Sequence, residues 1–396
     1  MGEAVRQADP SATERRLLRG GWSPAAFGRA DAAGADSYLR LHEYLPSARV
    51  VAGGVRSRLV AAVDPLVMGT AADTPTGRRC LREVVADEGV RALLIVRDGR
   101  LLLEHYGAMQ PSDVHVWMSV SKTLAGLLVA RLWQAGLVDP THSLVRYLPA
   151  FGDTAWRDVR VIDALNMAAG LDGEETPDST TDPRALITRF FLAEFGATPA
   201  GSTGSDYLEV LRTAGRIEAS GARTRYSSLV TNMLALMAET VSDTPLSTLL
   251  GQVWRAIGAE RDAILCLTPD GHGILHGLML SCARDLARYA VAHTKGARSR
   301  IVPPAYLRAI RDDGDPRAFR GSDLALRMEA AFLEPPRHNA WQWDAVFSDG
   351  DIFKSGLNGQ GLYVSPMKGF AMIWFGARPG GVPLHPFARA LARSIA

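Results

Sequence analysis

Residues 115–136 read HVWMSVSKTLAGLLVARLWQAG, and this segment decides the interpretation of the chain. Its second part carries apolar residues at helical spacing, at Leu124, Leu127, Leu128 and Leu132. Gly136 follows as a stop signal, so we expect a helix that ends there. Lys122 falls in the first turn, where the positive end of the helix dipole disfavours a cation. The position of Lys122 therefore calls for an explanation, and two serines lie beside it.

Ser119 and Lys122 are three residues apart, so on a helix they share a face with Cβ atoms about 5–6 Å apart. A neutral lysine amine at that distance can accept the serine proton and activate a weak nucleophile. A cation that the dipole disfavours is also easier to keep neutral. Ser121 is adjacent to Lys122 and points elsewhere, so we predict that Ser119 is the partner. A surface helix start with an incidental lysine remains the alternative.

The same spacing occurs a second time, at Ser365-Pro366-Met367-Lys368. Pro366 follows its serine, and the strand-like run GFAMIWF follows its lysine, so no helix carries this pair. Spacing alone is therefore weak, and the helix that follows distinguishes Ser119 from Ser365.

Strand-like segments lie on both sides of this helix in the sequence. In residues 91–107, two apolar runs flank Asp98-Gly99, a dipeptide typical of tight hairpins. Residues 361–381 hold two more strand-like runs, and 385–396 is a predicted terminal helix. Helical patterns in 227–241 and 281–294 lie between these ends. We expect an α/β (α+β) fold, with a central antiparallel sheet built from both ends, flanked by helices, and an inserted mainly helical lobe.

Composition excludes several classes of protein. The 396 residues are 47% hydrophobic and 22% charged, with a net charge of +2, which offers no electrostatic footprint for nucleic acid or an anionic membrane. We find no signal peptide and no run of about 18 apolar residues, so we expect a cytoplasmic protein. Three scattered cysteines, Cys80, Cys266 and Cys282, form no disulfide framework or CxxC pair and are predicted to be buried.

Two further segments carry residues of chemical interest. Tyr226 precedes a helical pattern, and a phenol that shares protons with Lys122 would have its pKa lowered by the cation and could act as an acid or base. Lys354-Ser355-Gly356 lies on a predicted strand before a glycine-rich turn, where a strand edge can present an N–H to an oxyanion. Taken singly, each segment favours a structural interpretation: a tyrosine that caps a core helix, and a basic strand end followed by a hairpin turn.

The order Ser119-x-x-Lys122, then Tyr226, then Lys354-Ser355-Gly356 resembles the serine β-lactamase and penicillin-binding-protein superfamily, nearest its class C branch. The segments MSVSK, YSS, SCARDLAR and GLNGQGLYVSP are most similar to the 6-aminohexanoate-dimer hydrolases (nylon-oligomer amidases) and related carboxylesterases. The resemblance covers roughly residues 50–396 and implies a β-lactamase/transpeptidase-like fold.

The resemblance also implies roles. Ser119 would be the nucleophile, and Lys122 with Tyr226 would form a proton relay. The backbone N–H groups of Ser119 and Leu357 would form the oxyanion hole, and Lys354-Ser355-Gly356 matches the superfamily's lysine-threonine-glycine motif. No metal and no organic cofactor is implied.

Domain bounds follow from the same resemblance. We expect residues 1–49 to form an extension packed on a catalytic domain of residues 50–396. In that domain, 50–160 with 320–396 would be the α/β lobe, and 161–319 the mainly helical lobe.

Three positions depart from the patterns of these relatives. Ser228 stands where class C enzymes have the asparagine of Tyr-x-Asn, as in the nylon-oligomer group. Asn358 stands where that group has a histidine, and His276 falls where it has an asparagine in the substrate pocket. We expect these residues to line a substrate pocket of altered chemistry.

Each remaining candidate residue has a structural alternative to its functional interpretation. His272 and His276 are four residues apart and could hold a metal, although no other ligand is near in sequence, which favours a structural role. Trp341 and Trp343 could line the substrate pocket or fill the core. Glu174 and Glu175 lie where these relatives have a loop near the site, but a solvated acidic turn is favoured.

Together, these patterns predict a serine acyl-transfer enzyme that forms an acyl-enzyme at Ser119 and hydrolyses a small ester or amide. Two alternatives remain: a transacylase that passes the acyl group to an amine, and an inactive binding or sensor module. The sequence predicts no nucleic-acid or membrane partner and does not define the oligomeric state.

Overall fold

A computed structural model of the protein describes residues 22–29, 32–86, 89–197 and 206–394. Its main sheet has eight strands in the order β10-β11-β12-β13-β14-β5-β6-β2. In that order the strands span His338–Ala340, Trp343–Val346, Ile352–Gly356, Gln360–Ser365, Phe370–Gly376, Val90–Arg97, Arg100–Tyr106 and Val60–Ala61. Neighbouring strands are antiparallel, except that β2 pairs in parallel with β6 at one edge.

Strands from the two ends of the chain meet in the centre of this sheet, as predicted. β5 and β6 form a hairpin whose turn residues, Asp98 and Gly99, have φ values of 48° and 74°. Both residues lie in the left-handed region that a two-residue hairpin turn of type I′ requires. β14 pairs along the other edge of β5, so the C-terminal strands complete the sheet that the N-terminal hairpin begins.

Two smaller sheets were not predicted. One has the order β1-β8-β9-β7, with strands Ser47–Val50, Ala263–Cys266, Met279–Ser281 and His115–Val116. The other pairs β3 (Ala71–Thr74) with β4 (Gly77–Cys80). Their strands have two to four residues, too short for a period-two pattern to emerge in the sequence. In the four-stranded sheet, β7 is followed by the turn that carries Ser119.

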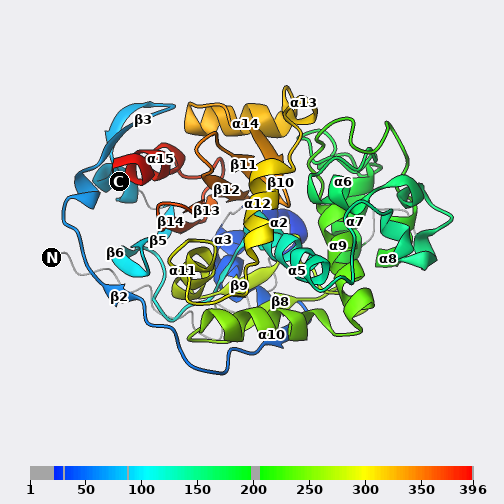
Figure 1. Ribbon diagram of the computed structural model, residues 1–396, viewed down its shortest axis with the longest axis horizontal. Coiled ribbons are helices and arrows are strands. Elements are labelled where there is room, and N and C mark those ends of the chain that lie inside the picture. Colours follow the sequence, from blue (N-terminus) through cyan, green and yellow to red (C-terminus); the bar gives the residue numbers. More distant parts are fainter. Residues whose placement is uncertain (1–21, 30–31, 87–88, 198–205, 395–396) are drawn as a thin grey trace.

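Helices cover both faces of the main sheet and form the right half of the molecule in Figure 1. The longer ones are α5 (Lys122–Gln134), α9 (Ser228–Ser242), α10 (Leu246–Ile257), α11 (Ala283–Ala292), α14 (Asp323–Phe332) and α15 (His385–Ser394). The other α-helices are α2 (Pro24–Arg29), α3 (Ala32–Arg40), α4 (Leu81–Val85), α6 (Val161–Leu165), α7 (Leu186–Glu194), α8 (Tyr207–Arg212), α12 (Pro304–Asp312) and α13 (Pro316–Phe319).

Short 3₁₀ turns connect these elements: η1 (Leu41–Glu43), η2 (Val67–Gly69), η3 (Met118–Ser121), η4 (Leu144–Arg146), η5 (Pro149–Phe151) and η6 (Ala155–Asp158). The predicted helix that ends at Gly136 and those in 227–241, 281–294 and 385–396 correspond to α5, α9, α11 and α15, and residues 395–396 lie outside the described ranges. Gly136 follows the first of them with a φ of 72°, as expected of a helix stop.

The core divides at the main sheet. Ala92, Leu94 and Val96 of β5 pack into a cluster with α5, α9 and α11, whereas Leu93 and Ile95 pack on the opposite face with α15. Both faces of β5 are therefore buried, which explains its continuous apolar sequence. Helix α5 is buried on nearly all sides, so its helical pattern lacks the polar face of a surface helix.

Cys266 and Cys282 are buried as predicted, but Cys80 is partly exposed, with its Sγ 3.2 Å from the Met68 carbonyl oxygen. In the described ranges, no helix has the length and apolarity that crossing a bilayer requires.

The helix that carries Lys122 packs closely against the β10–β11 turn. A Cβ added at Gly126 would lie 2.9 Å from Tyr306 Oη and closer still to the Trp341 carbonyl oxygen. We expect Gly126→Ala to lower the free energy of unfolding by about 1–2 kcal/mol, because the steric cost exceeds alanine's helix-propensity gain of about 1 kcal/mol. Urea denaturation measures this. The control Gly69→Ala, which adds a Cβ into open space, should leave stability nearly unchanged.

Candidate active site

Ser119 lies on a sharp turn between strand β7 and helix α5. Met118 has a φ of 49°, an unfavourable conformation for a residue with a side chain, and Trp117 is held by hydrogen bonds to the carbonyl of Met279 (2.8 Å) and the hydroxyl of Ser281 (2.9 Å). This turn leaves Ser119 partly exposed, whereas Ser121 is buried. The surroundings therefore favour Ser119 over Ser121 as a group that can meet a ligand.

Lys122 has three hydrogen-bond partners around its buried amine. Its Nζ lies 3.0 Å from Ser119 Oγ, 2.9 Å from Ser228 Oγ and 2.9 Å from the His276 carbonyl oxygen. The carbonyl can only accept, so it takes one N–H. If Ser228 accepts a second N–H, the lone pair of a neutral amine is left facing the Ser119 hydroxyl. The geometry thus suits proton transfer from Ser119 to Lys122.

The pKa of Lys122 is lowered to about 7, chiefly by burial and to a smaller extent by the nearby charge of Lys354. The carboxylates of Glu175, Asp344 and Glu194 act in the opposite direction. At neutral pH, a substantial fraction of Lys122 is therefore an uncharged amine. The helix dipole suggested such a neutral lysine, but desolvation is the larger cause.

Tyr226 brings its ring close to three basic side chains: Lys354 Nζ, Lys122 Nζ and the Arg327 guanidinium lie 4.5, 5.0 and 5.3 Å from its centroid. Its hydroxyl accepts a hydrogen bond from Lys354 Nζ at 3.0 Å. The predicted lowering of its pKa is nevertheless wrong. Burial raises the pKa of Tyr226 well above its ordinary value, and the charges of Asp344 and Glu175 add to this, outweighing the Ser119 hydrogen bond and Arg327. Tyr226 is thus a neutral phenol at rest.

Lys354 and Ser355 of β12 are held by Asp344 of the neighbouring strand β11. Lys354 Nζ forms a buried ion pair with Asp344 Oδ1, and Ser355 donates to Oδ2 through its hydroxyl and its backbone N–H (3.0 Å). Burial lowers the pKa of Lys354, but the pairing with Asp344 counters this. Asp344 was missed from the sequence, although a single carboxylate inside the apolar run WDAVF was a usable signal.

The interpretation of Glu174 and Glu175 as a solvated turn is wrong. Both are partly buried: Glu174 forms an ion pair with Arg225 (2.6 Å), and Glu175 Oε1 accepts the backbone N–H of Ser228 at 2.7 Å. Glu175 therefore fixes the start of helix α9, next to Tyr226. The helix N-terminus offers free N–H groups, and a carboxylate satisfies one of them.

The two backbone groups expected to form an oxyanion hole lie on facing segments. Ser119 is in the first turn of η3, where amides have no partner within the helix, and the Leu357 N–H forms no hydrogen bond with any described residue. A Cβ at Gly356 would lie 2.8 Å from the Trp117 carbonyl oxygen and 3.1 Å from Met118 Cβ. Glycine at 356 therefore lets β12 approach the Ser119 turn closely.

Of the expected pocket residues, Ser228 contacts Lys122 directly, whereas Asn358 faces the N-terminal helices. Asn358 Nδ2 donates to the Gly28 carbonyl oxygen (2.8 Å) and to Tyr38 Oη (2.7 Å). It is buried and has a φ of 61°, a conformation that asparagine tolerates better than most residues. The structure thus gives Asn358 a bracing position rather than an open side chain.

His276 pairs with Glu194, the last residue of α7. His276 Nε2 lies 2.9 Å from Glu194 Oε2. Asn232 links the two residues, because its Oδ1 accepts the backbone N–H of His276 (2.9 Å) and its Nδ2 donates to Glu194 (3.1 Å). Burial raises the pKa of Glu194 and lowers that of His276, so it disfavours the charged form of each partner. The backbone carbonyl oxygen of His276 accepts a hydrogen bond from Lys122 Nζ, so His276 lies near the site, as expected. Glu194 was missed, because it is 82 positions away in sequence.

His272 lies apart from this pair, stacked on Tyr207 with ring centroids 5.5 Å apart. Within the described ranges, no group of three His, Cys, Asp or Glu side chains is arranged to hold a metal ion. The arrangement favours the structural interpretation of His272 and His276.

Trp341 and Trp343 do not line a pocket, which corrects their assignment to the substrate site. Both are almost fully buried. Trp341 Nε1 donates to Asp313 (3.1 Å), and Trp343 Nε1 donates to Tyr306 Oη (3.3 Å). They belong to the core beneath α5, as the alternative interpretation held.

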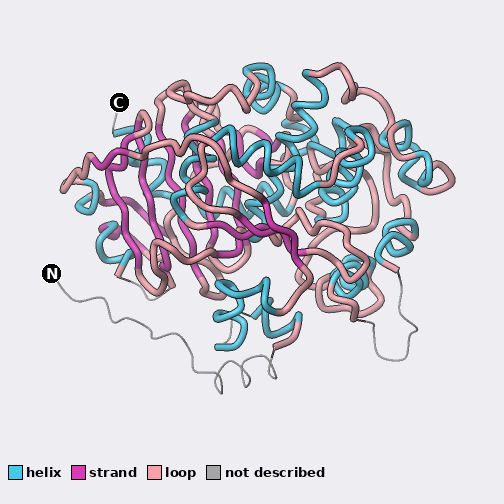
Figure 2. The backbone as a smooth tube through the Cα atoms, turned by 90° about the horizontal axis from the view of Figure 1, so that it is seen from below, coloured by secondary structure: helices cyan, strands magenta, loops and turns pink. Residues whose placement is uncertain are grey.

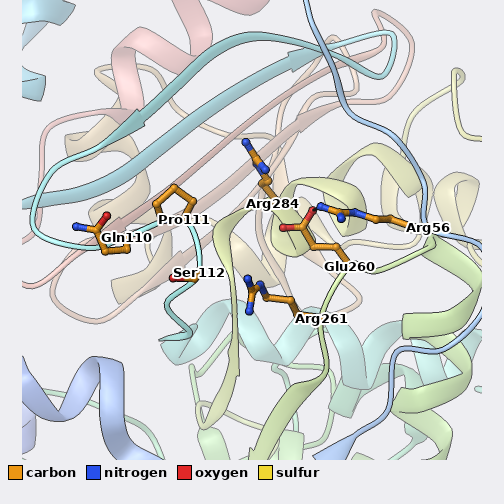
Figure 3. A pocket seen from close by; sticks show the side chains of 7 residues that line it. All are labelled: Arg56, Gln110, Pro111, Ser112, Glu260, Arg261 and Arg284. Carbon is orange, nitrogen blue, oxygen red and sulfur yellow. Dashed lines mark hydrogen bonds and ion pairs between the residues drawn. The ribbon is translucent and has the colours of Figure 1, made fainter. Parts of the chain in front are cut away.

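A separate polar cavity of about 420 Å³ contains none of these residues. Figure 3 shows its lining, which comes from the segment between β1 and β2, the loop before β7, the segment before β8 and the start of α11: Arg56, Gln110, Pro111, Ser112, Glu260, Arg261 and Arg284. Arg284 forms an ion pair with Glu104, and Arg56 forms one with Glu260. Two of the three arginines that line the cavity are therefore paired with a carboxylate.

Comparison with known proteins agrees with this geometry. The Beta-lactamase family matches residues 78–396. The chain belongs to the Beta-lactamase family. Serine hydrolase chemistry of the amidase and esterase type occurs in this superfamily, which supports an enzyme.

Individual relatives extend the likeness over most of the chain. The 6-aminohexanoate-dimer hydrolase of Paenarthrobacter ureafaciens is 26% identical over 350 residues, covering 87% of this chain and 85% of that protein. A Bacillus anthracis protein assigned as a 6-aminohexanoate-dimer hydrolase has a TM-score of 0.75 at 18% identity, covering 92% and 94% of the two chains. EstCE1, a hydrolase with promiscuous acyltransferase activity, has a TM-score of 0.58 at 16% identity, covering 78% and 96%.

The neutral state of Lys122 can be tested without a substrate. The chain has only four lysines, so lysine-selective NMR of the Cε and Nζ positions gives a resolvable set of signals. We expect one signal, absent in Lys122→Arg, to titrate near pH 7, with the ammonium form below and the amine above this value. A Lys122 midpoint near the ordinary value of about 10.4 would contradict the desolvated site.

Proposed function

We propose that this protein is a serine hydrolase that forms an acyl-enzyme at Ser119 and cleaves a small ester or amide. The observation that carries the proposal is the contact of Lys122 Nζ with Ser119 Oγ at 3.0 Å, with burial lowering the pKa of Lys122 to about 7. A neutral buried amine beside a partly exposed serine hydroxyl is the arrangement that nucleophilic catalysis requires.

In the first half-reaction, Ser119 Oγ attacks the carbonyl carbon while its proton passes to Lys122 Nζ. The oxyanion that develops is met by the backbone N–H groups of Ser119 and Leu357; loss of one such donor typically costs about 3–4 kcal/mol. The C–O or C–N bond of the substrate then breaks. The proton returns from Lys122 through the Tyr226 hydroxyl to the leaving group, so that the free alcohol or amine departs.

The raised pKa of Tyr226 suits this direction of proton flow. A neutral phenol can donate to the leaving group and be reprotonated by the Lys122 ammonium, whereas a resting phenolate could only accept. Lys354 stabilises the transient negative charge, since its Nζ donates to the Tyr226 hydroxyl. Asp344 and Ser355 act by holding Lys354 and β12 in place.

In the second half-reaction, water attacks the acyl-enzyme and the same relay runs in reverse. An amine could take the place of water, which would make the protein a transacylase. This alternative draws support from the fold it shares with EstCE1. The expected partners are therefore a small-molecule ester or amide and, for acyl transfer, an amine acceptor.

The substrate class that we propose for this protein is broader than that of the nylon-oligomer relatives. His276 carries the Glu194 pair at a position where those relatives have an asparagine, and Asn358 is engaged by the N-terminal helices. Because both positions differ in chemistry, we propose a general small ester or amide rather than 6-aminohexanoate oligomers. The cytoplasmic location stays a prediction.

Covalent labelling distinguishes an enzyme from an inactive binding module. A fluorophosphonate should add one adduct to the native protein, and the adduct should be absent in Ser119→Ala but present in Ser121→Ala.

The labelling rate should also depend on pH. Because Lys122 must be neutral to accept the proton, we expect the labelling rate to fall about tenfold per pH unit below pH 7 and to level off above pH 8. Intact mass spectrometry measures both. Equal labelling of native protein and Ser119→Ala would refute the proposed nucleophile.

Turnover of a panel of p-nitrophenyl esters, linear amides and β-lactams defines the substrate class. Ser119→Ala and Lys122→Ala should each lower kcat by at least about 10³-fold. Repeating the assay with an added primary amine separates the two reactions: hydrolysis yields the free acid throughout, whereas a transacylase yields an amide whose share rises with amine concentration.

A further inference from the structure

The N-terminal helices α2 and α3 lie outside the residues matched by the Beta-lactamase family, yet they reach the proposed catalytic site. They follow the grey N-terminal trace in Figure 2 and lie beneath the body of the molecule in that view. Their contacts go to two short segments, the β12–β13 turn and the turn that presents Ser119. These are the segments that carry the two expected oxyanion donors.

The contact with the β12–β13 turn runs through Asn358. Its Nδ2 donates to the Gly28 carbonyl oxygen at the end of α2 (2.8 Å) and to Tyr38 Oη on α3 (2.7 Å). Tyr38 in turn donates to the Phe27 carbonyl oxygen (3.2 Å), so one hydrogen-bonded chain ties both helices to the turn. All three bonds are buried or partly buried, where water competes poorly for them.

The turn is braced from its other side by the sheet. Gln360 Nε2 donates to the Leu357 carbonyl oxygen (2.6 Å), and the Arg378 N–H donates to the Asn358 carbonyl oxygen (3.0 Å). The main-sheet contacts therefore fix the carbonyl groups of Leu357 and Asn358. Among the described residues, the hydrogen bonds of the Asn358 side chain, at a φ of 61°, go to α2 and α3 alone.

The contact with the Ser119 turn is apolar. Phe27 and Tyr38 pack in one buried cluster with Val116 and Met118, the residues that lead into Ser119. Tyr38 also meets His115 edge-on, with ring centroids 5.8 Å apart. Tyr38 thus contacts both sides of the expected oxyanion hole, Asn358 on one side and β7 on the other.

We infer that α2 and α3 are a built-in positioning element of the active site, in which Tyr38 and Asn358 hold the Leu357 N–H at the distance from the Ser119 N–H that an oxyanion requires. The inference rests on the proposed function, because it assigns these residues to the stabilisation of a tetrahedral intermediate. Neither side chain touches the substrate; both act through the backbone of the turn. Loss of their hydrogen bond lets the turn relax and weakens oxyanion binding more than substrate binding.

The test compares Tyr38→Phe, Asn358→Gly and the double variant on a p-nitrophenyl ester. Glycine at 358 removes the amide and accepts the positive φ without strain, so it isolates the hydrogen bonds. We expect each single variant to lower kcat by about tenfold with KM unchanged. The double variant should lose no more than the worse single variant, because both changes break the same bond.

Ser37→Ala is the matched control. It deletes a buried hydroxyl from the neighbouring position of α3, where Ser37 donates to the Gly34 carbonyl oxygen (2.6 Å) and does not contact Asn358. Its kcat should equal that of the native protein even if its stability falls. Thermal unfolding of every variant separates loss of fold from loss of rate.

A second readout is the affinity of a boronic acid, whose adduct with Ser119 places an oxygen in the oxyanion hole. Its inhibition constant should rise about tenfold in Tyr38→Phe and Asn358→Gly and stay constant in Ser37→Ala. Native kcat and boronate affinity in both single variants, or an equal loss in Ser37→Ala, would overturn this inference alone. No turnover and no labelling of the native protein would overturn the proposed function and this inference with it.

Discussion

The burial of one lysine amine is the constraint on which the rest of the site depends. Lys122 begins a helix that is enclosed on nearly all sides, and its Nζ must therefore find all its partners within the protein. Ser119, Ser228 and the His276 carbonyl supply them, from three separate segments. Desolvation lowers the pKa of the amine towards neutrality, so the same burial that costs stability creates a base.

Three carboxylates near Lys122 raise the pKa of its amine and so oppose the effect of burial. Glu175 begins helix α9, Asp344 binds Lys354, and Glu194 is paired with His276. Each carboxylate is bound to another group and none contacts the Lys122 amine directly, so no ion pair restores its charge. Tyr226 lies among these groups as a neutral phenol, since burial outweighs the cations around its ring. Lys122 and Tyr226, two groups that can exchange protons in their neutral forms, are thereby both kept next to the Ser119 hydroxyl.

Backbone geometry completes the site at positions where side chains would interfere. Gly356 allows β12 to approach the Ser119 turn, and Met118 adopts a positive φ that turns Ser119 outward. The positive φ of Met118 stores backbone strain, whereas the glycine at 356 avoids a steric clash. Both segments must therefore be held in place by neighbouring elements. The four-stranded sheet provides this anchoring on the Ser119 side, because Trp117 is tied to Met279 and Ser281.

The sequence by itself determined the local features of this protein. The Asp98-Gly99 hairpin, helix α5 with its stop at Gly136 and the contact of Lys122 with Ser119 follow from turn chemistry and helical spacing, which act over a few residues. The approach of Tyr226 and Lys354 to Lys122 could be inferred only through a family resemblance, because their separation in the chain carries no distance information.

Only the tertiary structure decided the electrostatics and the partners of the site. The raised pKa of Tyr226, the pairing of Glu194 with His276, the hold of Asp344 on Lys354 and the placement of Trp341 and Trp343 in the core all result from burial among distant segments. The same is true of the Asn358 side chain, whose hydrogen-bond partners lie 320 or more positions away. Desolvation and long-range hydrogen bonds depend on the packed chain as a whole, so no local pattern in the sequence could reveal them.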